Sequence, residues 1–340
     1  MNTEFFRNIT EEELAKCGAL LRRGEIVAFP TETVYGLGAD ALNDTAVAKI
    51  FAAKNRPADN PLIAHVSDAD MVPLAARMVT PLAQKLFDAF WPGPLTVILP
   101  KAPALSAKVT AGGDTVAVRC PDHPIARALI KSAGVPIVAP SANLSGKPSP
   151  TDFETTAEDL SGKVAAIIDG GACSVGVEST VVLPTGENSL RILRPGAVTP
   201  EMLRALGLEV EIDPNVLAPL DHSRPVLSPG MKHRHYAPKA PLTIVTGAQE
   251  NVLAFLRQKQ TEGAGILCFE GELEGEYVRT YGAPEDDLAQ SRQLFAALRQ
   301  FDKLPVREIF ARKPTDKGMG LAVYNRLLRA AEFTVLEVEK

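Results

Sequence analysis

Short apolar runs rich in β-branched residues recur through the first two hundred residues, and they limit the folds open to this chain. Such runs are typical of strands, and they lie at 25–30, 60–66, 95–100, 115–119, 135–140, 164–169 and 179–184. Helical periodicity separates some of them, as at 45–56 and 123–134, whereas others follow one another directly. This mixture predicts an α/β fold with a mixed sheet rather than a purely parallel one.

Two helix-start signals frame this part of the chain. Thr10 forms a capping box with the glutamate three residues later. Thr199 is the expected N-cap of a short helix over 199–207, with Pro200 at the first helical position. We therefore predict a first domain over residues 1–207.

The pattern changes twice in the remaining chain. Residues 208–238 are expected to form an extended linker, because proline limits both helix and sheet; its prolines are Pro214, Pro219, Pro225, Pro229 and Pro238. From 239 to 340, strand and helix patterns alternate, which predicts a smaller, Rossmann-like α/β domain. The strands are expected at 241–247, 264–269 and 306–311, and the helices at 249–263, 285–304 and 320–333. No G-x-G-x-x-G loop supports a dinucleotide site there.

Composition and charge narrow the class of protein. Hydrophobic residues make up 46% and charged residues 23%, which is typical of globular proteins. Residues 1–200 carry 18 Lys+Arg against 21 Asp+Glu, and the remainder carries 18 against 20, so neither part has the basic excess of a general nucleic-acid binder. The acidic N-terminal stretch and the absence of long apolar runs predict a cytoplasmic protein.

The four cysteines are far apart in the sequence. Their spacing predicts neither a zinc site nor a disulfide framework. Each is expected to be a small buried apolar residue.

Two segments carry residues suited to an anionic ligand. Residues 29–41, FPTETVYGLGADA, place Thr33 and two glycines after a strand, where a backbone can approach a ligand. A tight turn without a ligand explains them equally well. Lys54 and Arg56 close a helix, where the helix dipole alone favours cations; near a turn, such a pair also suits phosphates.

Two further residues stand on apolar strands. His65 lies in such a strand, and a lone histidine in that setting is more often a core residue than a catalyst. Arg119 ends another one and needs an anionic partner, because an unpaired buried charge is very costly. An acidic side chain of the protein or a substrate carboxylate would satisfy it.

Three loops add hydroxyl, amide and guanidinium groups. Ser141, Asn143 and Ser149 follow a strand and suit an oxygen-rich ligand, although an ordinary hydrogen-bonded loop uses the same residues. Ser179 opens a strand, and Arg194 is held extended by the proline after it. For the last two, a structural role explains the pattern at least as well.

Together these segments resemble the YrdC-like family. The resemblance rests on FPTETVYGLGADA, the K-x-R of Lys54 and Arg56, and the S-x-N of Ser141 and Asn143. SPGMKHRHYAP at 228–238, followed by an α/β domain, is similar to the long, two-domain branch of that family. The resemblance covers nearly the whole chain and implies a twisted open mixed sheet around a concave, basic pocket.

The resemblance also implies an activity. Members of that branch make L-threonylcarbamoyladenylate from L-threonine, bicarbonate or CO2, and ATP, and release pyrophosphate. The product feeds the N6-threonylcarbamoyl modification of adenosine 37 in tRNAs that read codons starting with A. Mg²⁺ is expected on the ATP phosphates rather than in a protein cage. No covalent enzyme intermediate is expected, because no activated nucleophile is evident.

Site residues are carried over by the same resemblance. The catalytic residues would be Lys54, Arg56, Ser141 and Asn143. The ATP contacts would be Arg56, Asn60, Thr115, Ser141, Ser149, Arg194 and Tyr236. The L-threonine contacts would be Thr33, His65, Arg119 and Ser179.

The linker resembles a flap that folds back over the first domain's pocket. Tyr236 would then stack on or hydrogen-bond to the nucleotide, and Arg234 and His235 would add polar contacts. The alternative is a passive tether whose tyrosine packs against the second domain.

Two rival functions stay open. A basic concave pocket also suits an RNA-binding module, although the charge balance is slightly acidic and Trp91 is the only tryptophan. The other rival is a carbamoyl-phosphate-using enzyme with a YrdC-like domain, but the chain has no cysteine pattern for the zinc fingers of such proteins. Partners are expected to be ATP, L-threonine, bicarbonate and the tRNA threonylcarbamoyl-transferase machinery that receives the product, with no membrane and no strong direct nucleic-acid binding.

Overall fold

An 11-stranded mixed sheet forms the centre of the first domain in the computed structural model, which describes residues 2–219 and 235–339. The strand order is β1-β8-β2-β3-β7-β4-β6-β5-β9-β10-β11. The strands are β1 (Glu4–Phe6), β2 (Val27–Phe29), β3 (Gly36–Asp40), β4 (Ile63–His65), β5 (Leu95–Pro100), β6 (Thr115–Arg119), β7 (Ile137–Val138), β8 (Ala166–Ile168), β9 (Thr180–Pro184), β10 (Ser189–Arg194) and β11 (Glu209–Ile212).

Both strand directions occur in this sheet, as the sequence predicts. The pairs β4·β6 and β5·β9 are parallel, whereas β2·β3, β5·β6 and β9·β10 are antiparallel. Direct succession of β2 and β3, and of β9 and β10, requires only short connections because those neighbours are antiparallel.

The interpretation of Gly36 and Gly38 as turn residues is wrong, although Gly36 does line the pocket described below. Both lie in strand β3, which pairs with β2. A Cβ atom on Gly38 would lie 2.8 Å from Ile137 Cγ2 and 2.9 Å from the Phe29 ring. Glycine is therefore needed here for close packing inside the sheet.

The linker predicted at 208–238 starts too early. Residues 209–212 form β11, which pairs in parallel with β10 and extends the first domain's sheet. The prolines that suppress regular structure begin only at Pro214. Residues 220–234, including Arg234, lie outside the described residues.

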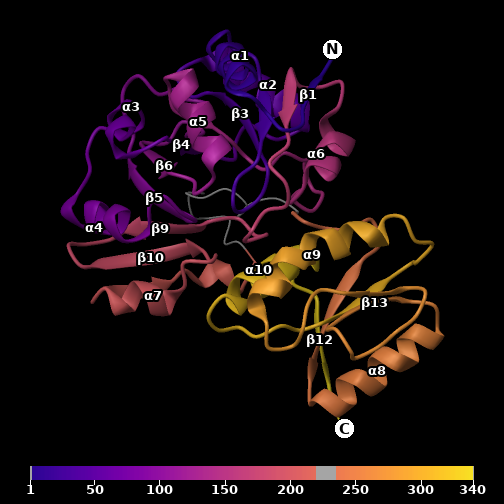
Figure 1. Cartoon of the computed structure of the whole chain (residues 1–340). Helices are drawn as coiled ribbons and strands as arrows, with labels where there is room; N and C mark the ends of the chain where they lie inside the picture. The colour runs from indigo at the N-terminus through magenta and orange to yellow at the C-terminus, as the bar shows by residue number, and fades with distance from the viewer. Residues whose placement is uncertain (1, 220–234, 340) are drawn as a thin grey trace.

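Helices pack around this sheet (Figure 1). They are α1 (Glu11–Arg22), α2 (Asp44–Lys54), α3 (Val72–Ala75), α4 (Pro81–Phe90), α5 (Pro124–Ala133), α6 (Phe153–Leu160) and α7 (Pro200–Ala205). The capping box at Thr10 is present, with both of its hydrogen bonds to Glu13. Thr199 caps α7 by accepting from the backbone N–H of Met202. These two local predictions are confirmed.

The second domain has a five-stranded sheet of order β14-β13-β15-β12-β16 in which every pair is parallel. Its strands are β12 (Leu242–Gly247), β13 (Gly265–Cys268), β14 (Val278–Thr280), β15 (Ile309–Arg312) and β16 (Val335–Val338). Its helices are α8 (Gln249–Thr261), α9 (Asp287–Phe301) and α10 (Gly320–Ala330). The prediction of a smaller doubly wound domain is confirmed.

The two domains meet through α9 and α10, whereas α8 lies on the outer side of the second sheet (Figure 1). Val34 and Val177 of the first domain are buried in one hydrophobic cluster with Phe295 of α9 and Val323 of α10. Because this cluster spans both domains, the interface is part of the protein's core.

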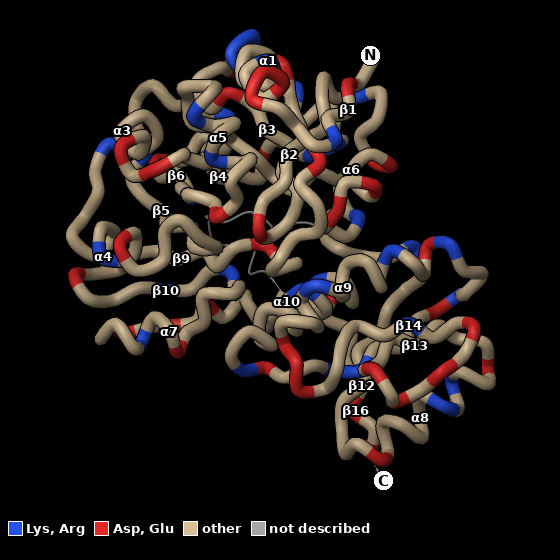
Figure 2. Tube along the Cα trace, viewed as in Figure 1, with Lys and Arg blue, Asp and Glu red and all other residues tan. Residues whose placement is uncertain are grey.

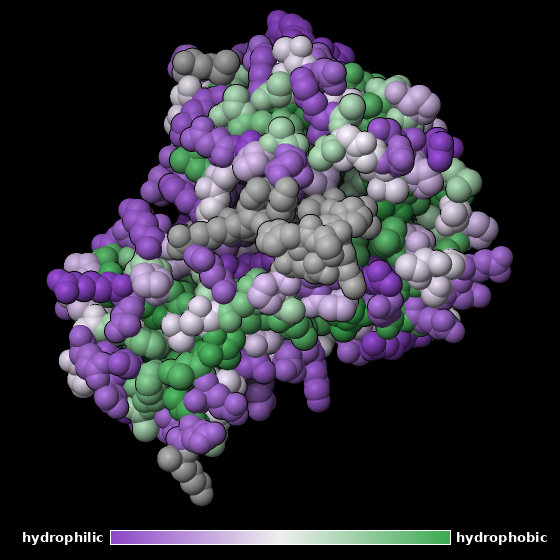
Figure 3. All heavy atoms as spheres, turned by 180° about the vertical axis from the view of Figure 1, so that it is seen from behind, coloured by the Kyte–Doolittle hydropathy of each residue, from purple (hydrophilic) through white to green (hydrophobic). Residues whose placement is uncertain are grey.

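Charges of both signs are interspersed over both domains (Figure 2). Seen from behind, hydrophilic side chains cover much of the surface, with hydrophobic ones between them (Figure 3). Within the described residues, no helix has the length and hydropathy needed to cross a membrane. All four cysteines are free and buried, as predicted.

Candidate functional site

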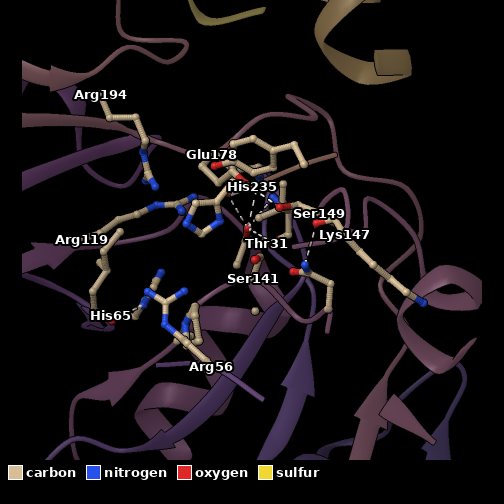
Figure 4. A pocket seen from close by; sticks show the side chains of 18 residues that line it. Thr31, Arg56, His65, Arg119, Ser141, Lys147, Ser149, Glu178, Arg194 and His235 are labelled. Atoms are coloured by element: carbon tan, nitrogen blue, oxygen red, sulfur yellow. Dashed lines mark hydrogen bonds between the residues drawn. The ribbon is translucent and has the colours of Figure 1, made fainter. Parts of the chain in front are cut away.

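One pocket gathers residues from loops and strand ends of the first domain with two residues near the end of the linker (Figure 4). The predicted site residues that line it are Thr33, Arg56, His65, Arg119, Ser141, Asn143, Ser149, Arg194 and Tyr236. Four others, Lys54, Asn60, Thr115 and Ser179, are not among its lining residues. The structure thus brings most of the predicted residues to one place.

Three arginines give the pocket its basic character. Arg56 follows α2, Arg119 ends β6 and Arg194 ends β10, and all three lie on the same side of the pocket (Figure 4). Burial lowers the pKa of Arg56 and of Arg194 to about 10, so both stay protonated at neutral pH. Such fork-shaped donors suit carboxylate and phosphate oxygens.

Some of these donors make no hydrogen bond to the described residues. The Nε atom of Arg56 and the Nε and Nη2 atoms of Arg119 make no hydrogen bond, although each is enclosed. Arg56 donates only a long bond of 3.4 Å, from Nη2 to the carbonyl of Pro61, among the described contacts. Since buried polar groups are normally hydrogen-bonded, these atoms point to an anionic ligand.

Arg119 does have a charged neighbour. Its Nη2 lies 2.7 Å from Oε2 of Glu32, which is itself buried, without the angle of a hydrogen bond. The sequence left open whether a protein carboxylate or a substrate carboxylate balances this arginine. Glu32 balances the charge, and the unbonded N–H groups leave room for a second carboxylate.

Lys54 lies behind the pocket wall. It is buried, and its Nζ donates to the carbonyls of Ser141 and Asn143. Asn143 in turn donates from Nδ2 to the carbonyls of Leu144 and Lys147, at 2.8 and 2.9 Å. Burial, with the neighbouring Arg56, lowers the pKa of Lys54 well below its usual range. The geometry makes Lys54 the support of the loop that carries Ser141.

Ser179 supports Arg194 in a similar way. Arg194 donates from Nε to the Ser179 carbonyl at 3.0 Å and from Nη2 to the Ser179 Oγ at 3.1 Å. The same hydroxyl lies 2.8 Å from the Thr96 hydroxyl. The pair therefore orients the guanidinium toward the pocket.

The remaining two predicted residues lie elsewhere. Thr115 starts strand β6, whereas Arg119 ends it, so the two Cα atoms are about 13 Å apart at the usual rise of a strand. Asn60 is buried and its Oδ1 has no partner. Their assignment to ATP stays a prediction.

The sequence did not single out Glu178, which also lines the pocket. Its Oε1 accepts from the Ser149 hydroxyl at 2.6 Å, and its Oε2 accepts from Arg326 Nε at 2.7 Å. Burial raises the pKa of this carboxyl, but Arg326 and Arg194 outweigh it and lower the pKa to about 2. Its position before Ser179 was not enough to identify it from the sequence, because its partner Arg326 lies 148 positions away.

Lys147, Thr31 and His235 are further polar residues that line the pocket. Lys147 points away from the centre of the pocket (Figure 4), and its Nζ pairs with Asp159 at 2.7 Å. Thr31 donates to the carbonyl of Val34 and accepts from the Thr33 backbone N–H, which shapes the turn between β2 and β3.

The position of Tyr236 agrees with both alternatives for the linker, a flap over the pocket and a passive tether. Its ring stacks on Phe295 of the second domain, with centroids 5.0 Å apart, as a tether would require. It also lines the pocket, as a flap would require. Its backbone φ of 62° is left-handed, which costs a non-glycine residue on the order of 1 kcal/mol, so the surrounding contacts hold it there.

Similarity to known proteins agrees with this geometry. A family model described as telomere recombination matches residues 19–196, and one described as threonylcarbamoyl-AMP synthase, C-terminal domain, matches 198–332. The threonylcarbamoyl-AMP synthase of Bacillus subtilis is 46% identical over 96% of this chain and 97% of its own length. The chain belongs to the threonylcarbamoyl-AMP synthase family. That of Pyrococcus abyssi is 42% identical, over 97% of each chain.

The family assignment extends to the fold. The crystal structure of P. abyssi Sua5 complexed with L-threonine has a TM-score of 0.91 and 41% identity, and the match covers 100% of both chains. The sequence-based resemblance to the two-domain branch is thereby confirmed.

The two histidines that line the pocket, His65 and His235, are neutral at physiological pH. Burial, followed by the charge of Arg119, lowers the pKa of His65 to about 3. Burial, followed by the charge of Arg56, lowers the pKa of His235 to about 3 as well. Neither is suited to act as a general acid near neutral pH.

This burial predicts a pH dependence of stability. Between the ordinary histidine pKa of about 6.5 and the folded value of about 3, the unfolded chain binds a proton that folded His65 does not. The free energy of unfolding therefore falls with decreasing pH in this window, by up to about 1.4 kcal/mol per pH unit for this residue. Urea denaturation of wild type and His65→Gln at pH 7 and pH 5 should give a smaller pH-dependent loss for the variant. Equal losses would contradict the prediction.

Proposed function

We propose that this chain makes L-threonylcarbamoyladenylate from L-threonine, bicarbonate or CO2, and ATP, and releases pyrophosphate. The observation that carries the proposal is the cluster of three arginines in one pocket, with unbonded N–H groups on Arg56 and Arg119. Full-length similarity to threonylcarbamoyl-AMP synthases at 42–46% identity supports it. So does the structure of P. abyssi Sua5 complexed with L-threonine.

The reaction brings two anions together. The amine of L-threonine takes up CO2 and loses a proton, which gives an N-carboxylate. An oxygen of that carboxylate forms a bond to the α-phosphorus of ATP, while the bond from this phosphorus to pyrophosphate breaks. Both reactants are negatively charged, so the site must neutralise charge and align them.

The pocket offers groups for each reactant. Arg119, with Thr33 and His65 beside it, would hold L-threonine through its carboxylate. Arg56 and Arg194, with the hydroxyls of Ser141 and Ser149, would hold the phosphates. In this arrangement Lys54 and Ser179 act by supporting Ser141 and Arg194 rather than by touching the substrates.

Mg²⁺ would enter with the nucleotide. The carboxylate that lines the pocket in the described part of the chain is Glu178, and its two oxygens already accept from Ser149 and Arg326. The described residues contain no cluster of three metal-ligating side chains. An ion held by the phosphates and water fits this donor set, because Mg²⁺ usually keeps several waters.

We further propose a cytoplasmic enzyme whose product passes to the tRNA threonylcarbamoyl-transferase machinery for adenosine 37. The alternative function of an RNA-binding module has little support, since charges of both signs are mixed over both domains (Figure 2). Trp91 is stacked on Phe87, with centroids 3.7 Å apart, rather than presented to bases.

Pyrophosphate release from ATP tests the proposal. Release by the full chain is expected to require both L-threonine and bicarbonate, and to fall when serine replaces threonine. Mass spectrometry should find threonylcarbamoyladenylate in the complete mixture. Release that ignores threonine would indicate a generic ATPase, and ATP binding without release would favour a binding module.

A further inference from the structure

Arg326 of α10 crosses from the second domain into the wall of the pocket. It is fully buried, with an exposed fraction of 0%. Its Nε donates to Glu178 Oε2 at 2.7 Å, and its Nη2 donates to the Glu178 carbonyl at 3.0 Å. Its Nη1 donates to the carbonyl of Pro195 at 2.9 Å and to Asn325 Oδ1 at the same distance. One side chain thus holds two separate loops of the first domain.

Both loops carry residues of the pocket. Glu178 lines the pocket beside Ser149 (Figure 4) and accepts the Ser149 hydroxyl on its other oxygen, so Arg326 is linked to Ser149 through one carboxylate. Pro195 directly follows Arg194. The guanidinium carbon of Arg326 also lies 6.0 Å from the centre of the Tyr236 ring. Ser149, Arg194 and Tyr236, which these contacts reach, all belong to the side assigned to the nucleotide.

Glu178 creates an electrostatic difficulty that Arg326 removes. A carboxylate that faces a triphosphate site repels the ligand, and the repulsion is strong where water is excluded. Arg194 also lowers the pKa of Glu178, but it is a pocket arginine and is needed for the incoming anion. The charge of Arg326 lies on the far side of Glu178 and is available to neutralise it permanently.

We propose that Arg326 is a positioning residue through which the second domain completes the nucleotide half of the pocket. It neutralises Glu178 and holds that carboxylate where it orients Ser149. This inference rests on the proposed function, because it takes ATP as the ligand beside Ser149 and Arg194. It also gives the second domain a part in the reaction.

Arg299 provides a matched control for domain docking. This arginine of α9 also crosses between the domains, donating from Nη2 to the Pro148 carbonyl at 2.6 Å and to Asp159 Oδ2 at 2.8 Å. Neither acceptor lines the pocket, but Pro148 directly precedes Ser149, so Arg299 holds a pocket loop without contacting Glu178. A residue that only joins the domains would behave like Arg299.

The first comparison is Arg326→Gln against Arg299→Gln, both in the full chain. We expect Arg326→Gln to raise the KM for ATP at least tenfold, while the KM for L-threonine changes less than threefold. Arg299→Gln should leave both KM values within threefold of wild type. Equal behaviour of the two variants, or an unchanged KM for ATP in Arg326→Gln, would overturn the proposal.

The second comparison tests the charge on Glu178. In Arg326→Gln, the Glu178 carboxylate loses its counter-charge and the KM for ATP rises. Adding Glu178→Gln removes the repulsion, so the KM for ATP of the double variant should be at least threefold lower than that of Arg326→Gln. No recovery in the double variant would overturn the electrostatic part.

Arg326→Lys covers the case in which Arg326→Gln does not fold. Lysine keeps the charge but cannot bridge Glu178 and Pro195, so a raised KM for ATP with an unchanged KM for L-threonine is expected, and unchanged values for both would overturn the proposal. Failure of the proposed function would appear in the wild type as pyrophosphate release without a threonine requirement. Failure of this inference would appear only in the variants.

Discussion

Replacement of Arg56 by methionine is expected to lower the turnover number for pyrophosphate formation about 100- to 1,000-fold, the usual loss when one preorganised donor to a developing charge is removed. Arg56 is positioned for this role because, among the described residues, its Nε makes no hydrogen bond and its bond to the Pro61 carbonyl is long, at 3.4 Å. Its charge is retained at neutral pH, since its pKa is about 10. Steady-state pyrophosphate release at saturating substrates measures the effect.

The fold should survive this change, because the hydrogen bond that the Arg56 side chain makes to the described residues is a single long one. The melting temperature is expected to stay within about 2 °C of wild type, because a loss of about 1 kcal/mol shifts the melting temperature of a chain this long by less than that. Arg191→Met is the matched control: this arginine pairs with Glu211 at 2.9 Å between β10 and β11, away from the pocket. Near-normal turnover in Arg56→Met would contradict the assignment of Arg56 to the phosphates.

The features predicted correctly from sequence depend on local interactions. The capping box at Thr10 and the N-cap at Thr199 are completed by residues within three positions. The alternation of strands and helices in the second domain likewise follows from periodicity within each segment. These patterns are sufficient for fold class, because each segment's own sequence carries the signal.

The features that were missed depend on contacts between distant residues. Gly38 is needed because Ile137 and Phe29 pack over it, and nothing near Gly38 in the sequence distinguishes this use from a turn. Strand β11 is only four residues long and is stabilised by pairing with β10. Tertiary pairing of this kind decides short strands more than intrinsic propensity does.

The functional site shows the same difference between residues with a local sequence signal and residues that depend on distant contacts. The basic residues Arg56, Arg119 and Arg194 were identified by residue type together with family resemblance, and the structure brings them into one pocket. Glu178 was missed because a single glutamate before a strand carries no signal until its partner Arg326 is known. Supporting residues are therefore harder to predict than the groups that face the ligand.

Arg119→Gln is expected to raise the KM for L-threonine at least 100-fold while leaving the KM for ATP within a few-fold of wild type. A bidentate arginine–carboxylate contact contributes both charge and geometry, which a glutamine cannot replace. The Nε atom of Arg119 makes no hydrogen bond to the described residues and is therefore available to the amino acid's carboxylate, whereas Nη2 already lies 2.7 Å from Glu32 Oε2. Kinetics with each substrate varied in turn separate the two KM values.

Because Arg119 is paired with the buried Glu32, the experiment also needs a double variant. Arg119→Gln alone leaves Glu32 buried, with an exposed fraction of 6%, and without its counter-charge; breaking a buried pair in this way costs about 3–5 kcal/mol of unfolding free energy. The double variant Arg119→Gln/Glu32→Gln removes both charges and should regain most of that stability in urea denaturation. Its KM for L-threonine should nevertheless stay at least 100-fold above wild type, because neither glutamine supplies a cation. Recovery of threonine affinity together with stability would mean that Arg119 serves the fold and that another group binds the carboxylate.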